Sequence, residues 1–407
     1  MRVVLAFSGG LDTTFCAAWL RRERGAEVVT VTVDTGGTGR EEREAIALRA
    51  REAGAAEHRE IDARQAVFDR FIAHLIRGNV LRGEVYPLSV AAERTQQAIE
   101  VARVARELGA DAVAHGSTGA GNDQVRFDVA FRCLLPGVPI LTPVRDLGLA
   151  REDAVAYLEK AGIPAPPSRG LYSVNRGLWG TTIGGGWTHD PWKPPPEDAW
   201  DGVGDAGPCE VVVGWEEGLP VSLDGRPLRG PELVEELAEL TRARGIGRGI
   251  HVGETVLGIK GRIGFEAGAA VVLIAAHREL EKLCLTRWQA FWKDHLARFY
   301  GDRLHEGQAF DPVMRDIEAM IASSQRHVCG ETRVRLEPGR FAVNGARSPR
   351  SLMAPDVARY GETHHLWDGS EARAFAKLAA IPSILAARRD ERRAGAEEDR
   401  PWPTPYA

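Results

Sequence analysis

The sequence predicts an α/β fold whose first domain is a parallel β-sheet covered by helices on both faces. In the first 160 residues, short apolar runs rich in β-branched residues alternate with amphipathic stretches of helical spacing. A glycine-rich segment directly follows the first of these runs, and proline-rich loops begin near residue 164. Together these observations indicate a nucleotide-binding domain followed by a region of different architecture.

Each element of the first region follows from the local pattern. Apolar β-branched runs predict strands, whereas apolar residues repeating at helical spacing predict helices. We expect strands at residues 3–7, 28–33, 57–61, 112–114 and 140–144, and helices at residues 13–22, 41–52, 66–76, 91–108 and 152–161.

The second region begins with two irregular, proline-rich stretches, near residue 164 and at residues 191–196. After them the pattern predicts a hairpin of residues 210–215 and 220–223, turning at Glu217 and Gly218, and a helix at 231–243. Residues 271–300 are expected to form mostly one long helix with an aromatic stripe, more typical of a core or subunit interface than of a cofactor site. The stripe consists of Trp288, Phe291, Trp292 and Phe299. The charged tail beyond Arg388 is expected to need a neighbour to become ordered.

The composition is that of a folded globular protein. Of 407 residues, 44% are hydrophobic and 27% are charged, which excludes disorder for the bulk of the chain. The formal net charge of -5 gives no overall basic surface for nucleic acid, and no apolar run is long enough to span a membrane. The five cysteines include no Cys-x-x-Cys pair and the 11 histidines no His-Glu-x-x-His, so neither a disulfide framework nor a protein metal site is expected. We therefore expect a soluble, cytoplasmic protein that binds neither nucleic acid nor membrane.

A candidate phosphate-binding loop follows the first predicted strand. The segment Ser8-Gly9-Gly10-Leu11-Asp12-Thr13-Thr14 leads into a helix whose first turn holds Asp12 and Thr13. The glycines let backbone N–H groups approach oxyanions, the hydroxyls donate hydrogen bonds, and the helix N-terminus favours negative charge. A capped glycine turn without a ligand is the alternative, but the position at the carboxyl end of the first strand favours a phosphate site.

The groups that are absent from this loop restrict the reactions that it can support. It does not contain the Gly-x-x-x-x-Gly-Lys-[Ser/Thr] pattern, so no lysine is present to hold the β- and γ-phosphates, and it carries the carboxylate of Asp12 instead. Such a loop suits Mg²⁺-bound pyrophosphate as a leaving group better than γ-phosphoryl transfer. We therefore expect attack at the α-phosphorus of ATP and an acyl- or imidoyl-adenylate.

A second polar cluster lies at residues 115–127. It follows the apolar strand at 112–114 and is therefore expected at the same carboxyl edge of the sheet, where ligands of open α/β sheets bind. Three glycines and seven hydrogen-bonding side chains in 13 residues exceed what a connecting loop needs, although a structural glycine turn is the alternative. Asn122, Asp123 and Arg126 supply groups suited to a zwitterionic, amino-acid-like ligand.

The two segments resemble those of argininosuccinate synthase. The resemblance rests on Ser-Gly-Gly-Leu-Asp-Thr at residues 8–13 and on His-Gly-x-Thr-Gly-x-Gly-Asn-Asp-Gln-Val-Arg-Phe at residues 115–127. Further landmarks of that family follow in order at residues 86–88 together with Arg94, and at residues 172–180, 190–192, 245–248, 258–260 and 276–281, so that the resemblance covers residues 1–385.

The resemblance implies both an architecture and a reaction. It implies a PP-loop ATP-binding domain at residues 1–165, an α+β synthetase and multimerisation domain at 166–370, and a C-terminal helix and tail at 371–407 in a homotetramer. In the implied reaction the ureido oxygen of citrulline attacks the α-phosphorus of Mg-ATP and releases pyrophosphate, and the amino group of L-aspartate then displaces AMP. ATP and Mg²⁺ are the implied cofactors, and arginine biosynthesis is the implied pathway.

The resemblance also implies site residues, with Asp12 and Asp123 as the catalytic ones. ATP is expected at Ala6, Phe7, Ser8, Gly9, Gly10, Leu11, Asp12, Thr13, Thr14 and Gly116; aspartate at Thr118, Asn122 and Asp123; and citrulline at Tyr86, Ala91, Asn122, Arg126, Ser173, Thr182, Gly253 and Phe265.

Several departures from the family pattern fall at the amino-acid end of citrulline. Ala91 replaces a hydroxyl-bearing residue, Gly253 a glutamate that faces the citrulline α-amino group, and Phe265 a tyrosine. Loss of the carboxylate that pairs with an ammonium removes charge compensation and opens volume. The changes look like the branch of the family that uses N-acetyl- or N-succinylcitrulline. Sequence drift, or compensation by Glu254, would leave free citrulline as the substrate.

Two other function classes are weighed against the ligase. RNA-modifying enzymes that adenylate a tRNA base use a similar Ser-Gly-Gly-x-Asp loop, but they need a basic RNA face and often paired cysteines, which this chain does not have. A non-catalytic ATP-binding or scaffold protein is the other class, because Ala120 stands where most members of the family carry a lysine.

Overall fold

The computed structural model describes residues 1–167, 170–200, 204, 206–362 and 364–394. The chain divides into two compact units, Met1–Leu352 and Met353–Ala407, and each is described by itself.

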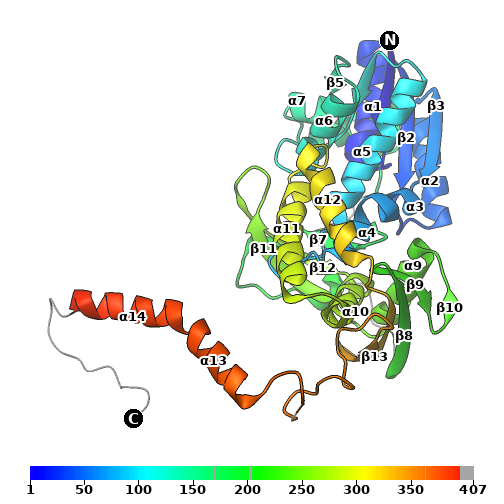
Figure 1. Ribbon diagram of the computed structural model, residues 1–407. Helices are drawn as coiled ribbons and strands as arrows, with labels where there is room; N and C mark the ends of the chain where they lie inside the picture. Colours follow the sequence, from blue (N-terminus) through cyan, green and yellow to red (C-terminus); the bar gives the residue numbers. More distant parts are fainter. Residues whose placement is uncertain (168–169, 201–203, 205, 363, 395–407) are drawn as a thin grey trace. The chain divides into compact units, whose positions relative to one another are not determined.

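The N-terminal part of the first unit is built on a five-stranded parallel sheet (Figure 1). Its strands are β1 (Arg2–Ala6), β2 (Glu27–Asp34), β3 (Glu57–Asp62), β4 (Ala112–Ala114) and β5 (Ile140–Leu141), in the order β3-β2-β1-β4-β5. The winding direction reverses between β1 and β4, which makes the crevice at their carboxyl ends the topological switch point. All five predicted strands are present; β5 is short because Pro143 starts a new helix, α7 (Pro143–Asp146).

Helices cover both faces of this sheet, as the sequence predicts. One face carries α1 (Leu11–Arg24), α2 (Arg40–Glu52) and α8 (Arg151–Lys160), and the other carries α5 (Ser89–Glu107) and α6 (Asp123–Leu134). Successive strand residues divide between the two apolar layers, since Val3 and Leu5 belong to the first layer and Val4 to the second. The predicted helix at 66–76 is present in three pieces, α3 (Arg64–Val67), the π-helical turn η1 (Phe68–Ile72) and α4 (Ala73–Arg77).

The rest of the first unit contains two antiparallel sheets as well as helices. The five-stranded sheet has the order β10-β9-β8-β13-β14 and contains β8 (Cys209–Glu216), β9 (Leu219–Leu223), β10 (Arg226–Pro227), β13 (Gly330–Glu337) and β14 (Arg340–Arg347). The four-stranded sheet has the order β11-β12-β7-β6 and contains β6 (Ser173–Gly177), β7 (Gly180–Gly184), β11 (Arg248–Glu254) and β12 (Lys260–Glu266). Short 3-10 turns, η2 (Gly186–His189) and η3 (Glu197–Ala199), interrupt the predicted irregular stretch after β7.

The predicted hairpin is confirmed as β8 and β9. Glu217 and Gly218 at its turn both have positive φ, which two-residue hairpin turns of matching twist require. The predicted helix at 231–243 is confirmed as α9 (Gly230–Arg242).

The prediction of one long helix at residues 271–300 is wrong. The segment forms α10 (Gly268–Cys284) and α11 (Arg287–His305), and α12 (Pro312–Gln325) packs on α11. The chain restarts at Thr286, whose hydroxyl accepts the N–H of Gln289 while the side chain of Gln289 accepts the N–H of Thr286. This capping box starts a new helix although the apolar periodicity continues across it.

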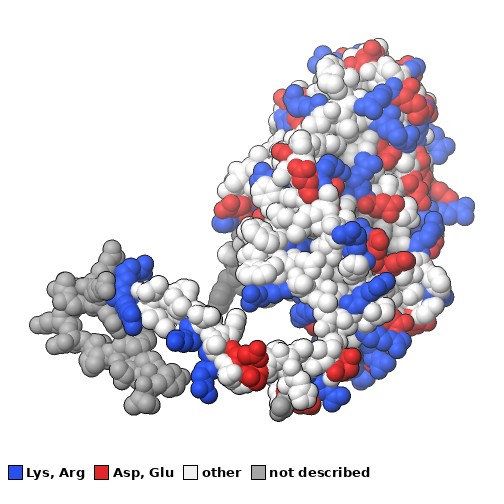
Figure 2. Space-filling model, viewed as in Figure 1, with Lys and Arg blue, Asp and Glu red and all other residues white. Residues whose placement is uncertain are grey.

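The aromatic stripe of α11 lies on the surface of the first unit. Trp288, Phe291, Trp292 and Phe299 are between 45 and 60% exposed. The surface over α11 is largely uncharged in Figure 2, whereas Lys and Arg are interspersed with Asp and Glu over most of the face drawn. The stripe therefore contributes little to the core of a single chain.

The second unit contains α13 (Gly369–Ala379) and α14 (Ile381–Ala394) in its described part. The side chain of Asp368 caps α13 by accepting the N–H groups of Ser370 and Glu371. Apolar side chains along these helices, including Phe375 and Leu385, are exposed. The predicted tail beyond residue 394 lies outside the described residues. None of the described helices is long and apolar enough to cross a membrane.

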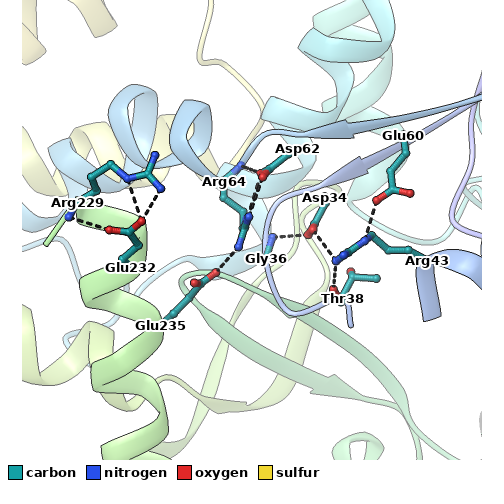
Figure 3. Close-up of polar contacts among 10 residues, drawn as sticks. All are labelled: Asp34, Gly36, Thr38, Arg43, Glu60, Asp62, Arg64, Arg229, Glu232 and Glu235. Carbon is teal, nitrogen blue, oxygen red and sulfur yellow. Dashed lines mark hydrogen bonds and ion pairs between the residues drawn. The ribbon is translucent and has the colours of Figure 1, made fainter. Parts of the chain in front are cut away.

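Charged side chains connect the carboxyl edge of the parallel sheet to α9 (Figure 3). Arg64 lies between Asp62 at the end of β3 and Glu235 of α9, at 2.7 and 3.1 Å. Arg43 pairs with Asp34 at the end of β2 and with Glu60 of β3. These pairs are mostly part-exposed, so each adds little stability alone, but together they mark where α9 lies beside the parallel sheet.

Candidate active site

Two loops meet at the switch point between β1 and β4. The first is the phosphate loop after β1, and the second is the polar cluster that begins at His115 after β4. A Cβ placed on Gly116 would lie 3.0 Å from Cγ2 of Thr13 and 3.2 Å from its backbone nitrogen. The second loop therefore lies directly against the first turn of α1, and a side chain at position 116 would press on that turn.

Hydrogen bonds within the phosphate loop fix its shape. The hydroxyls of Ser8 and Thr13 lie 3.3 Å apart, and the N–H of Gly10 donates to the hydroxyl of Ser8 at 3.4 Å. Gly9 has a φ of 66°, a conformation that favours glycine, and its carbonyl accepts a hydrogen bond from Arg49. No side chain caps α1 at Gly10, so the first N–H groups of the helix face the loop without a side-chain acceptor. This arrangement suits an oxyanion.

Thr14 differs from the other hydroxyl residues of the loop. Its side chain is fully buried, and its hydroxyl has no hydrogen-bond partner among the described residues. The expectation that both threonine hydroxyls donate to phosphate therefore does not fit Thr14 in this conformation, whereas Thr13 is only half-buried.

Asp12 presents a carboxylate in the first turn of α1. Burial raises the pKa of this carboxyl, and the charge of Arg151 offsets only part of the effect. In the part of the chain that the structure describes, no hydrogen bond or ion pair engages its side chain, and no group of three His, Cys, Asp or Glu could hold a metal alone. Mg²⁺ is commonly bound by one or two carboxylates together with substrate phosphates, so Asp12 fits Mg²⁺ that arrives with ATP.

His115 anchors the second loop from the protein interior. It is fully buried, its Nε2 donates to Asp128 at 2.8 Å, and its Nδ1 accepts the N–H of Ser117 at 3.2 Å. Arg145 pairs with the other oxygen of Asp128 at 3.2 Å. Burial raises the pKa of Asp128, but the hydrogen bond from His115 and the charge of Arg145 outweigh burial and lower it below the ordinary value.

Asp123 joins two arginines at the N-terminus of α6. Its carboxylate accepts from Nε of Arg94 at 2.9 Å and from Nη1 of Arg126 at 2.8 Å. Burial alone would raise the pKa of Asp123, but the two guanidinium groups hold it below the ordinary value. Arg94 also donates to Oδ1 of Asn175 on β6 at 2.6 Å, and the buried Arg126 donates to the carbonyl of His305. Asp123 thus holds the side chains of Arg94 and Arg126 in place where the parallel sheet meets the four-stranded sheet.

The other residues predicted to bind aspartate lie in the same loop. Thr118 is exposed, and Oδ1 of Asn122 accepts the N–H of Val256 at 2.8 Å. Val256 belongs to the turn between β11 and β12. The loop therefore contacts the four-stranded sheet as well as α1.

Half of the residues predicted to bind citrulline, namely Ser173, Thr182, Gly253 and Phe265, share one face of the four-stranded sheet. Direct pairing places Thr182 of β7 beside Asn175 of β6 and Phe265 of β12, and Phe265 beside Gly249 of β11. Since directly paired residues project to the same side, these positions form a row across the sheet. Side chains two or four positions apart on one strand project to the same side. Ser173, two positions before Asn175, therefore lies on this side, and so do His251 and Gly253, two and four positions after Gly249.

Tyr86 packs on this face from the segment before α5. Its ring stacks on His251 with 5.7 Å between ring centres and lies 5.4 Å from that of Phe265. Burial raises the pKa of Tyr86 to about 12. Ala91 belongs to the same buried apolar cluster as Tyr86 and Phe265.

Gly253 and Glu254 face opposite sides of β11. A Cβ placed on Gly253 would lie 2.6 Å from Nε2 of His251, so the imidazole borders the space where a side chain at 253 would begin. The carboxylate of Glu254 instead pairs with Lys260 at 2.8 Å, with both side chains at least 60% exposed.

Glu93 is a buried carboxyl on α5 next to Arg94. Burial raises the pKa of Glu93 to about 8, and the charge of Arg94 offsets only part of that shift. Its Oε1 has no hydrogen-bond partner in the described residues. Gly177 of β6 leaves room for it, because a Cβ at position 177 would overlap the carboxyl group.

The sequence pattern does not reveal several residues of this site. From the sequence alone we could not assign the direction in which the side chains of Glu93, Asn175 and His251 point. Arg94 enters only as part of a family landmark. Asn175 follows Ser173 by two positions, so a predicted strand at 173–177 would have placed both on one face.

Two family models match the chain in sequence order. The model described as the arginosuccinate synthase N-terminal HUP domain matches residues 2–164, and the model described as the arginosuccinate synthase C-terminal domain matches residues 172–386. The two loops at the switch point fall in the first match, and the four-stranded sheet falls in the second. The matched residues cover nearly all of the described chain, and the chain belongs to the argininosuccinate synthase family, whose members are ATP-dependent ligases.

Proposed function

We propose that this ATP-dependent citrulline–aspartate ligase acts on N-acylated citrulline rather than on free citrulline. Membership of the family gives the ligase reaction and the use of ATP. We add to this a substituent on the α-amino group of citrulline. Its principal support is the absence of a carboxylate at Gly253, where the family pattern has a glutamate that faces that amino group.

The surroundings of Gly253 support this substrate. Glu254, which could have compensated, lies on the opposite side of the strand and is paired with Lys260. Burial and the charge of Arg82 lower the pKa of His251, and Arg82 itself pairs with Asp302 at 3.7 Å. An α-ammonium here would lack the family glutamate as its anionic partner, whereas an acylated nitrogen is neutral and needs none.

The two steps require little proton chemistry from the protein. In the first, the ureido oxygen of the substrate forms a bond to the α-phosphorus of ATP, and the bond to pyrophosphate breaks. In the second, the neutral amino nitrogen of aspartate bonds to the ureido carbon, the carbon–oxygen bond to AMP breaks, and the proton that the nitrogen loses passes to the phosphate of the departing AMP or to water. Mg²⁺ held with Asp12 would neutralise charge on the pyrophosphate.

The proposed roles divide between the two loops and the sheet. Ser8, Gly9, Gly10 and Thr13 hold the phosphates, and Gly116 lets the second loop approach them. Thr118, Asn122 and Asp123 bind aspartate, with Asp123 orienting Arg94 and Arg126. Tyr86, Ser173, Thr182 and Phe265 line the ureido-substrate end.

Pyrophosphate release with three ureido substrates tests the proposal. With ATP and aspartate in excess, N-acetyl- or N-succinylcitrulline should show a kcat/KM at least about tenfold above that of citrulline, which corresponds to about 1.4 kcal/mol of transition-state binding. Identical reactions without aspartate control for ATP hydrolysis. A higher kcat/KM for free citrulline would contradict the N-acyl substrate, ADP and phosphate as primary products would contradict adenylation, and no turnover with any substrate would favour the non-catalytic alternative.

We also propose that the protein is a homotetramer. The exposed aromatic stripe of α11 and the exposed apolar side chains of α13 and α14 support further association, because soluble chains rarely leave such surfaces uncovered.

A further inference from the structure

We propose that His251 recognises the acyl group of the substrate by donating a hydrogen bond from Nε2 to the acyl carbonyl oxygen. This inference rests on the proposed function, and it names the group that would distinguish an N-acylated citrulline from a free one.

The first observation is an unsatisfied polar atom. His251 is 8% exposed, and its Nε2 has no hydrogen-bond partner among the described residues. A buried donor or acceptor without a partner is energetically unfavourable, so a ligand that supplies the partner recovers this cost on binding.

The second observation is the direction in which this atom points. Nε2 is the atom of His251 nearest to a Cβ built on Gly253, at 2.6 Å, whereas Cε1 and Nδ1 face Gly83 at 2.9 and 3.1 Å from its built Cβ. Glycine on both sides makes room for the ring, and Tyr86 fixes its plane by stacking. The ring therefore presents Nε2 toward the position that the family pattern reserves for recognition of the α-amino substituent.

The third observation concerns the charge of the ring and its surroundings. Burial and the charge of Arg82 lower the pKa of His251, so the imidazole is neutral near pH 7 and carries one N–H. Arg82 itself bonds Nε2 of His305 and the carbonyl of Glu254. Arg82 also pairs with Asp302 at 3.7 Å, so its charge is partly balanced. A neutral imidazole with its N–H on Nε2 can donate to the oxygen of an amide carbonyl but not to a cationic amine.

The decisive variant is His251→Phe, which keeps an aromatic ring against Tyr86 and removes both nitrogens. We expect kcat/KM for N-acetyl- and N-succinylcitrulline to fall at least about tenfold, mainly through KM, because one hydrogen bond to a buried polar group is lost. The KM for ATP and the kcat/KM for free citrulline should change less than about twofold, since the interaction is absent with that substrate. His251→Gln, which retains a donor, should recover part of the loss.

The control variant is Val252→Gln on the same strand, because Val252 is 55% exposed and projects to the other side of the sheet. Gly253→Ala provides a second test that retains the imidazole, since its methyl group would lie 2.6 Å from Nε2 and would therefore displace the ring. We expect it to reduce N-acylcitrulline use as His251→Phe does, so the inference can be tested even if the phenylalanine variant does not fold.

The outcomes separate this inference from the proposed function. If the wild type prefers N-acylcitrulline but His251→Phe and Gly253→Ala leave its KM unchanged, the role of His251 is wrong and the substrate assignment stands. If the wild type prefers free citrulline, the proposed function itself is wrong. Equal losses for all three ureido substrates would mean that His251 only supports the fold and would overturn the inference.

Discussion

At the scale of residues, Asp12 is the residue to which we assign the most direct role in the adenylation chemistry. Its carboxylate lies in a loop without a lysine and has no protein partner among the described residues. We expect Asp12→Ala to lower the rate of AMP and pyrophosphate formation at least about a hundredfold, because a group that stabilises charge in the transition state is lost. Asp153→Ala, at an exposed position on α8, is the matched control. Near-normal turnover of Asp12→Ala over a Mg²⁺ titration would show that this carboxylate does not serve the metal complex.

Titration of Glu93 makes the free energy of unfolding depend on pH in a direction that is unusual for a carboxyl group. Its pKa is raised to about 8 in the folded protein, against an ordinary value near 4.5. Between these values the folded protein binds more protons than the unfolded chain, so the contribution of Glu93 to stability falls as pH rises from 4.5 to 8. Glu93→Gln should match the wild type near pH 5 and have the higher midpoint of urea unfolding at pH 8. An equal difference between the two proteins at both pH values would contradict a neutral Glu93.

At the scale of elements, α10 and α11 are joined by a buried ion pair behind the capping box. Nζ of Lys293 lies 2.8 and 3.0 Å from the two carboxylate oxygens of Glu281, and both side chains are almost fully buried. Removing the cation alone leaves a buried carboxylate without its cationic partner. Lys293→Met should therefore lower the free energy of unfolding by about 3–5 kcal/mol, and adding Glu281→Gln to this variant should restore much of the lost stability. Lys282→Met breaks the exposed pair with Glu279 and should cost at most about 1 kcal/mol. Urea unfolding of the four proteins measures the difference; a similar cost for both lysines would contradict the burial argument.

The elements also differ in how far the sequence predicts them. The parallel sheet and its helices follow from β-branched runs and helical spacing, and both polar loops lie at the carboxyl edge where the strand order places them. The four-stranded sheet was not predicted, because its strands contain glycines, such as Gly177, Gly180, Gly249 and Gly253, which remove the alternating side chains that signal a strand. Two of those glycines, Gly177 and Gly253, border Glu93 and His251, so the part of the site to which we assign substrate selectivity was the least visible.

At the scale of the whole molecule, the exposed aromatic stripe of α11 predicts association. Trp292→Glu together with Phe299→Glu should reduce the mass measured by light scattering during size-exclusion chromatography, because the charges oppose burial of this surface. Leu48→Glu, at an exposed site on α2, is the control and should leave the mass unchanged. A wild type that elutes as a monomer at all concentrations would contradict the tetramer.

The fit of Glu93 against Gly177 has a consequence for how this sequence can change over generations. Any side chain at position 177 would collide with the Glu93 carboxyl, while a small residue at 93 would leave a void beside that glycine. A larger residue at position 177 is therefore tolerated only after, or together with, a smaller residue at position 93. We expect the two positions to covary among related chains: those with glutamate at 93 should keep glycine at 177, and those with a larger residue at 177 should carry a smaller one at 93.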